Sequence, residues 1–203
     1  MMEKVVIVIL GGFFGFALSM FKDYFFAIKR QKTERYYLAI IVSASLETFI
    51  SKCIEVVCDD GKYGERDYLE PQVRTPDFEP MKLDVAWQSL DKELLYELLT
   101  LPEKINDANA HISDVSEHIA SGPDFEEFFD MRKLKYSELG LLACSITEKL
   151  RTAAKLPPYV QGEWSPETIF NEQKEIARKA IAATEKRNRE AYTNLYSTSN
   201  PST

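Results

Sequence analysis

The 203-residue chain has few of the residues that mark flexible linkers, disulfide frameworks or metal centres. Glycine and proline number only 8 and 9, so no large part of the chain resembles a low-complexity linker. The three cysteines, Cys53, Cys58 and Cys144, are odd in number and widely spaced, which argues against a disulfide framework. Cys53 and Cys58 would lie roughly 140° apart on a helix and could not form a metal-ligand pair there. We therefore expect buried, reduced cysteines.

The sequence also lacks the short motifs that carry many enzymatic reactions. It contains no G-x-S-x-G nucleophile elbow, no H-E-x-x-H zinc motif and no G-x-x-x-x-G-K-[ST] phosphate loop. The adjacent acids Glu126 and Glu127 would diverge around a helix, and their favourable interaction with a helix N-terminus explains them better than catalysis. We therefore predict that the protein is not an enzyme and has no cofactor.

Positive charge is scarce outside the N-terminal region. The chain carries 25 Lys and Arg against 32 Asp and Glu, a net charge of −7. Residues 1–35 hold six cationic and three acidic residues, so the rest of the chain carries a net charge of −10. An acidic body lacks the positive surface that nucleic-acid binding requires. The sequence therefore predicts no nucleic-acid partner.

What the chain does contain is a long apolar run near its N-terminus, residues 5–21. These 17 residues carry no charge and would span about 26 Å as a helix, close to the hydrocarbon thickness of a bilayer. Lys22 could extend to the headgroups, and the aromatic residues at 24–26 would lie in the membrane interface. The run therefore predicts a transmembrane anchor.

Two other interpretations of the run stay open. Its order, VVIVIL followed by GGFFG, resembles the start of a dinucleotide-binding fold, but Leu10 replaces the first glycine of G-x-G-x-x-G and no further βα units follow. A secretory signal peptide is the other interpretation, with residues 17–19 as a loose cleavage site, and it would leave a periplasmic helical domain. The positive charge follows the run instead of preceding it. This favours an uncleaved anchor with the N-terminus outside and the rest of the chain in the cytoplasm.

The anchor offers two kinds of contact. Gly11, Gly15 and Ser19 share a helix face in the small-xxx-small pattern, which predicts packing against a second membrane helix, although glycine is also common in such helices. Basic side chains beyond the run could bind anionic lipid headgroups as well as set the topology. The four residues concerned are Lys29, Arg30, Lys32 and Arg35.

The remaining chain predicts helices with short connections and one long loop. No Gly or Pro interrupts residues 22–57. Residues 59–88 form the longest irregular stretch, which we expect to be packed by its aromatic residues: Tyr63, Tyr68, Phe78 and Trp87. We expect Pro102 to kink a helix, break it or begin the next one. The predicted helix N-caps are Ser89, Asp124 and Ser165.

Apolar spacing predicts the buried face of each helix. In the first soluble helix the stripe comprises Leu38, Val42, Phe49, Cys53 and Val56. A narrow heptad seam comprises Leu101, Ile105, Ala108, Ile112, Val115 and Ile119. The face of the last helix comprises Ile169, Gln173, Ile176, Ala180, Thr184 and Arg187. That stripe fades toward the C-terminus, which indicates a solvated extension or a coiled coil that awaits a partner.

The two histidines form the best candidate for a metal site. Asp107, His111, Asp114 and His118 fall on one helix face, and imidazole and carboxylate ligands two turns apart can converge on a divalent metal. Each of them, however, directly precedes a residue of the heptad seam, so the row also fits a solvated shoulder beside the core. A metal-binding protein or an enzyme that uses this face is the alternative function.

The segments RQKTERYYLAI, RTPDFEPMKLDVAWQSLDKELLYELLTLPEKINDAN and LPPYVQGEWSP resemble a group of bacterial single-span membrane proteins with a helical soluble part and no established activity. The resemblance covers most of the chain from about residue 22 to 164. It implies a bacterial inner-membrane setting, and it carries over no catalytic residues.

Together these features predict an all-α protein with a cytoplasmic helical bundle on a transmembrane helix. The expected divisions are an anchor with its interface (1–28), a long juxtamembrane helix (29–58), an irregular loop (59–88), a helical bundle (89–196) and a disordered tail (197–203). The predicted function is a single-pass scaffold or adaptor that presents its acidic bundle to a protein partner or to a second copy of the chain.

Overall fold

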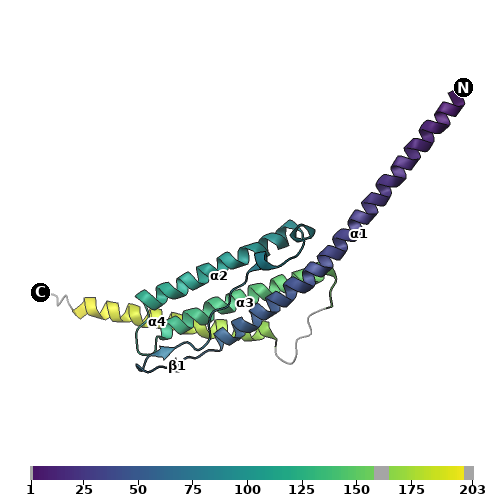
Figure 1. Ribbon diagram of the computed structural model, residues 1–203. Coiled ribbons are helices and arrows are strands. Elements are labelled where there is room, and N and C mark those ends of the chain that lie inside the picture. The colour runs from purple at the N-terminus through teal and green to yellow at the C-terminus, as the bar shows by residue number, and fades with distance from the viewer. Residues whose placement is uncertain (1, 158–164, 199–203) are drawn as a thin grey trace.

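The computed structural model describes residues 2–157 and 165–198 of the chain, except for the side chains of residues 2–17, 192 and 194–198. The described part is almost entirely helical, which confirms the predicted all-α class. Four long helices dominate it: α1 (Met2–Val57), α2 (Lys92–His118), α3 (Glu126–Ala154) and α4 (Pro166–Thr198). Figure 1 shows α2, α3, α4 and the C-terminal half of α1 side by side, while the N-terminal half of α1 projects away from them.

Helix α3 lies at the centre of the bundle and packs against α1, α2 and α4. The predicted stripes of α1 and α2 are confirmed as core faces, except that Ile119 lies just beyond the end of α2 and is 52% exposed. The largest fully buried side chains include Leu38, Leu46, Leu98, Leu101, Ile105, Tyr136, Ile146, Leu150 and Phe170. The C-terminal half of α1 therefore belongs to the bundle core.

The buried face of α4 differs from the prediction by about one residue. Phe170 and Ala177 are fully buried, whereas Ile176 is 52% exposed. The reason lies on α3, where Gly140 faces the ring of Phe170 so closely that an added Cβ would overlap it. The ring fills the space that the absent side chain leaves. Phe170 and Ala177 thus lie at the centre of the buried face, while Ile169, Gln173, Ala180 and Thr184 of the predicted face are half-buried at its side.

Several predicted helix boundaries were wrong. Asp91, not Ser89, is the N-cap of α2, and its Oδ1 accepts a hydrogen bond of 2.9 Å from the Leu94 amide. Of the three outcomes expected for Pro102, breaking the helix and beginning the next one are wrong, because Pro102 lies inside α2, where packing of the neighbouring buried residues outweighs one lost backbone hydrogen bond. Phe125, in a left-handed conformation, precedes α3 in the position predicted for Asp124.

The loop between α1 and α2 contains regular elements that the sequence did not predict. It contains a two-stranded hairpin of β1 (Lys62–Tyr63) and β2 (Leu69–Glu70), and two 3-10 turns, η1 (Pro80–Lys82) and η2 (Trp87–Ser89). Phe78 is buried and Trp87 packs partly against the core, as expected. The hairpin tyrosines, in contrast, are about half exposed. They instead hold the hairpin to the α2–α3 connection.

Those two contacts are specific. The Tyr63 hydroxyl donates a hydrogen bond of 2.5 Å to Asp124 Oδ1, and the Tyr68 ring packs edge-on against Phe125. The carboxylate of Asp124 therefore binds the hairpin and does not cap α3. Both contacts lie at the end of the bundle that is opposite to the projecting half of α1 (Figure 1).

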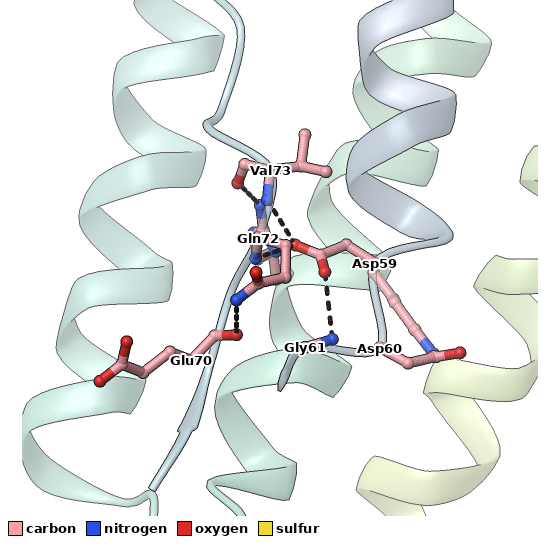
Figure 2. A network of polar contacts seen from close by, with 8 residues as sticks. Asp59, Asp60, Gly61, Glu70, Gln72 and Val73 are labelled. Atoms are coloured by element: carbon pink, nitrogen blue, oxygen red, sulfur yellow. Dashed lines mark hydrogen bonds and ion pairs between the residues drawn. The ribbon is translucent and has the colours of Figure 1, made fainter. Parts of the chain in front are cut away.

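A buried ion pair fixes the start of the loop. Arg132 of α3 donates a hydrogen bond of 2.7 Å from one terminal nitrogen to Asp59 Oδ2, and the two side chains are only 3% and 4% exposed. Figure 2 shows that Asp59 also accepts backbone hydrogen bonds from Gly61 at 3.0 Å and from Gln72 and Val73 at 2.9 Å each. Arg132 also donates to the Val73 carbonyl. The network thus joins the end of α1, the loop and α3.

Substitution of Asp59 should destabilise the whole fold. In Asp59→Asn the guanidinium of Arg132 stays buried without its charge partner, and such losses cost about 3–5 kcal/mol of unfolding free energy. The matched control is Asp60→Asn, because Asp60 is 84% exposed and pairs with Lys133 at the surface. A surface pair of this kind contributes no more than about 1 kcal/mol. Urea unfolding of the full-length chain in a mild non-ionic detergent measures the unfolding free energy of wild type and of both variants. An equal loss of unfolding free energy in the two variants would contradict the assigned role of the buried pair.

The same carboxylate should make stability sensitive to acid. Burial raises the pKa of Asp59, but hydrogen bonds from Arg132, Val73 and Gly61 outweigh this effect and hold the pKa below its usual value. A carboxyl whose pKa is lowered in the folded state stabilises the protein above its unfolded pKa of about 3.9, and this stabilisation disappears as the pH falls through the folded value. The difference in unfolding free energy between wild type and Asp59→Asn should therefore be constant near neutral pH and shrink in acid. A difference that does not change with pH would refute this account.

Candidate functional site

The projecting half of α1 exposes an unusual amount of apolar surface. From residue 18 onward the side chains are described, and six large apolar ones are between 57% and 67% exposed. These are Leu18, Met20, Phe21, Tyr24, Phe25 and Phe26. No other part of the bundle lies beside this segment in Figure 1. Contiguous exposed apolar surface of this kind marks a membrane or protein contact.

These side chains cover about two thirds of the helix circumference, and Ser19 and Asp23 occupy the remaining face. At about 100° per residue, Tyr24, Phe25 and Phe26 point in three different directions around the helix axis. A helix that packs on one protein partner needs an apolar stripe on one side only. An apolar surface that covers about two thirds of the circumference is wider than such a stripe and instead fits an environment that encloses most of the helix. Lys22 lies within this belt, and its ammonium is 5.8 Å from the centre of the Phe26 ring.

The predicted transmembrane span itself is not found in the described part of the chain. None of the helices there is both long and apolar enough to cross a membrane. Of the predicted run, residues 5–21, only the last four residues have described side chains. Gly11 and Gly15 of the predicted helix-packing face lie outside the described side chains, and Ser19 is exposed.

The four basic residues beyond the run do not share one role. Lys29, Arg30 and Lys32 are exposed, and Arg30 forms an ion pair of 2.8 Å with Glu34 one turn later. Arg35 instead donates a hydrogen bond of 2.8 Å from Nε to the Ser89 carbonyl at the end of η2. Arg35 therefore fastens α1 to the start of α2, and its guanidinium is already engaged in the fold. Headgroup binding by the other three stays a prediction.

A cavity of about 610 Å³ lies between α1, α3 and the first turn of α4. Its apolar wall includes Ile50, Leu156 and Pro166, and its polar lining comes mainly from the last turns of α3. Sequence reasoning missed it because its residues come from three elements and follow no local pattern. A volume of this size is typical of small-molecule sites.

Two polar features define the chemistry of this cavity. Arg151 donates a hydrogen bond of 2.9 Å to Glu47 Oε1, which links α3 to α1 across the wall. Burial, together with the negative charge and hydrogen-bond acceptance of Glu167, raises the pKa of the Cys144 thiol to about 12. A thiol that stays protonated at neutral pH is a poor nucleophile, so Cys144 does not support covalent catalysis.

The other cysteines agree only partly with the prediction. Cys53 is buried and free, and burial raises the pKa of its thiol. Cys58 is free but exposed, contrary to expectation, because it lies just beyond the last turn of α1. Burial is again the largest cause of a raised pKa, partly offset by Lys133. Cys58 is thus the single exposed thiol of the chain.

The predicted metal face is a solvated row of side chains. His118 and Asp114 are 68% and 62% exposed, and His118 Nδ1 lies 3.3 Å from Asp114 Oδ1. Asp107 and His111 line a separate hollow of about 370 Å³ between α2 and α3, together with Lys104 and Lys135. Glu138 also lines this hollow, but it forms ion pairs of 3.6 and 3.5 Å with Lys174 and Arg178 of α4. Across residues 2–157 and 165–198 the structure contains no group of three or more His, Cys, Asp or Glu side chains that could hold a metal ion.

Comparisons with protein-family models, with curated proteins and with solved structures gave no match for this chain. The resemblance to bacterial single-span membrane proteins therefore stays a prediction.

Proposed function

We propose that this protein is a membrane-anchored helical scaffold, which uses the N-terminal half of α1 as a single-pass anchor and presents an acidic helical bundle to a protein partner. The observation that carries the proposal is the belt of exposed apolar residues around α1 beyond the bundle. Burial of apolar surface contributes about 25 cal/mol per Å², so six such side chains would gain several kcal/mol in a lipid environment. The last residues of the uncharged run at residues 5–21 form the start of this belt.

The shape of α1 supports the scaffold part of the proposal. The helix is unbroken from Met2 to Val57, and its C-terminal half lies in the bundle core. A continuous helix transmits the orientation of the anchor to the bundle. Helix α1 rises about 18 Å from Phe26, the last aromatic residue of the belt, to Leu38, the first fully buried core residue, and would hold the bundle about that far from the membrane surface.

Charge supports the proposed orientation and the kind of partner. The basic residues near 29–32 follow the anchor, which by the positive-inside rule favours an outside N-terminus and a cytoplasmic bundle in a bacterial inner membrane. The net charge of −10 on residues 36–203 favours a partner with a basic surface. The metal-binding alternative receives no such support from the described residues.

Charged substitutions in the belt should release the protein from membranes. The variant Leu18→Arg/Phe21→Arg places two cations at the end of the proposed span, and an arginine costs up to about 3 kcal/mol in the centre of a membrane helix and less toward its ends. Membrane pellets washed with alkaline carbonate should retain wild type and several-fold less of the variant. Tyr96→Arg/Met81→Arg is the matched control, because these residues are 71% and 76% exposed on the bundle. Extraction of the wild type by carbonate, or equal retention of all three proteins in the pellet, would contradict the proposal.

The native cysteines test the orientation. Cys58 is exposed while Cys53 and Cys144 are buried, so a membrane-impermeant maleimide should label Cys58 alone. Because its pKa is raised, the reaction should be run at mildly alkaline pH, where more thiolate is present. We expect labelling in inverted membrane vesicles and none in intact spheroplasts, with Cys58→Ser as the unlabelled control. Labelling of spheroplasts would reverse the proposed topology.

A further inference from the structure

The cavity between α1, α3 and the first turn of α4 has a size and a lining that suit a small organic ligand. Its volume of about 610 Å³ falls within the range of about 300–1,000 Å³ that is usual for such sites. Ile50 is 7% exposed and Cys144 is 8% exposed, so these two residues form a dry inner wall. Leu156 and Pro166 extend the apolar lining toward the mouth. An apolar group would therefore be well accommodated inside.

The charges around the cavity are predominantly negative. Glu47, Glu148 and Glu167 line it, while Arg151 is the one cation among the described lining residues. Arg151 is already committed, because it binds Glu47 through one terminal nitrogen and the Pro157 carbonyl through Nε and the other nitrogen, at 3.0 and 2.8 Å. Three of its five N–H groups are therefore engaged, and its charge is paired with that of Glu47. The carbonyl end of α3 adds negative potential at the same place.

The opposite helix end does not cancel this potential. The N-terminus of α4 also reaches the cavity, but Glu167 occupies its first turn and offsets the partial positive charge there. Glu167 accepts a hydrogen bond of 2.5 Å from the Ser165 hydroxyl and one from the Cys144 thiol. Glu148 is exposed at the edge of the cavity and is the carboxylate that a bound cation would meet first.

We infer that this cavity binds an organic cation with an apolar body, such as a protonated arylalkylamine. An apolar wall, a surplus of carboxylates and a committed arginine together favour this ligand class over anions and neutral molecules. A bare metal ion fits less well, because within the described residues no three His, Cys, Asp or Glu side chains converge closely enough to hold one. The inference does not depend on the membrane anchor.

Binding of a matched pair of probes tests it. Isothermal titration of the purified full-length chain in a non-ionic detergent would use 4-phenylbutylamine and 4-phenylbutyrate, which have the same apolar body and opposite charges. We expect the amine to bind with 1:1 stoichiometry and the carboxylate to bind at least tenfold more weakly. Titration into empty detergent micelles corrects for partitioning. No saturable binding of the amine, or equal binding of both probes, would overturn the inference.

Substitutions then locate the site. Glu148→Gln should weaken amine binding about tenfold, because a charge-assisted contact is lost. Thr152→Trp should abolish binding by filling the cavity from an exposed position of α3. Glu103→Gln, an exposed glutamate of α2 outside the cavity, is the matched control and should bind like wild type. If Thr152→Trp does not fold by circular dichroism, Glu148→Gln decides alone. Unchanged affinity in Glu148→Gln would refute the site, whatever the membrane experiments show.

Discussion

The ion pair between Asp59 and Arg132 is the constraint on which the arrangement of the bundle depends. Removing two charges from water costs several kcal/mol per ion, and the cost is recovered only when the remaining donors and acceptors are satisfied. Here both oxygens of Asp59 accept backbone hydrogen bonds from the loop, and Arg132 also donates to the loop carbonyl of Val73. Only one path of the chain after α1 supplies all these groups at once. The pair therefore selects that path, and it contributes specificity more than net stability.

This path determines where the other elements can pack. Gly61 adopts a positive φ of 73° directly after the pair, and an added Cβ there would overlap the ring of Phe129 on α3. The loop can therefore cross α3 closely and carry the hairpin to the α2–α3 connection. The loop then ends at η2, where the Ser89 carbonyl accepts a hydrogen bond from Arg35 of α1. Two arginines from different helices thus fasten the two ends of the same loop.

The sequence predicted the regular features well because they are local. Leu38, Val42 and Phe49 repeat with helical spacing, and Leu101, Ile105 and Ala108 do the same, so the spacing alone assigns their faces correctly. On α4 the spacing misses Phe170, which lies at the centre of the buried face because its ring fits the space at Gly140 on another helix. Asp59 and Arg132 are residue types that usually lie at the surface, so nothing local marks them as buried. The cavity escaped prediction for the same reason, because Glu47, Cys144 and Glu167 meet only after three helices have packed.

The predicted polar site and the observed one also differ in a physical sense. The row from Asp107 to His118 follows one helix face and has the residue types of a ligand set, but a single helix cannot enclose a metal. Helix α3 adds only Lys135 and Glu138 as charged groups there. The cavity beside Arg151 draws its charges from two helices and the start of a third, which is how proteins usually enclose a ligand. Convergence of side chains from several helices therefore distinguishes the cavity from the row as a candidate ligand site. Such convergence joins residues that are far apart in the chain, so a single sequence carries no local pattern that reveals it.

The proposed anchor and the acidity of the bundle make opposing electrostatic demands. A bundle with a net charge of −10 would be repelled by an anionic membrane surface if it lay directly against the headgroups. Repulsion between exposed charges is largely screened beyond the Debye length of about 8 Å at physiological ionic strength. The segment of α1 between Phe26 and Leu38 would be about twice that length, because it rises roughly 18 Å at about 1.5 Å per residue. The basic residues at 29–32, in its first half, could then face the headgroups while the acidic bundle stays beyond most of their field. The length of the projecting half of α1 is therefore required by the charge distribution, since a much shorter helix would bring the acidic bundle within range of repulsion by the anionic headgroups.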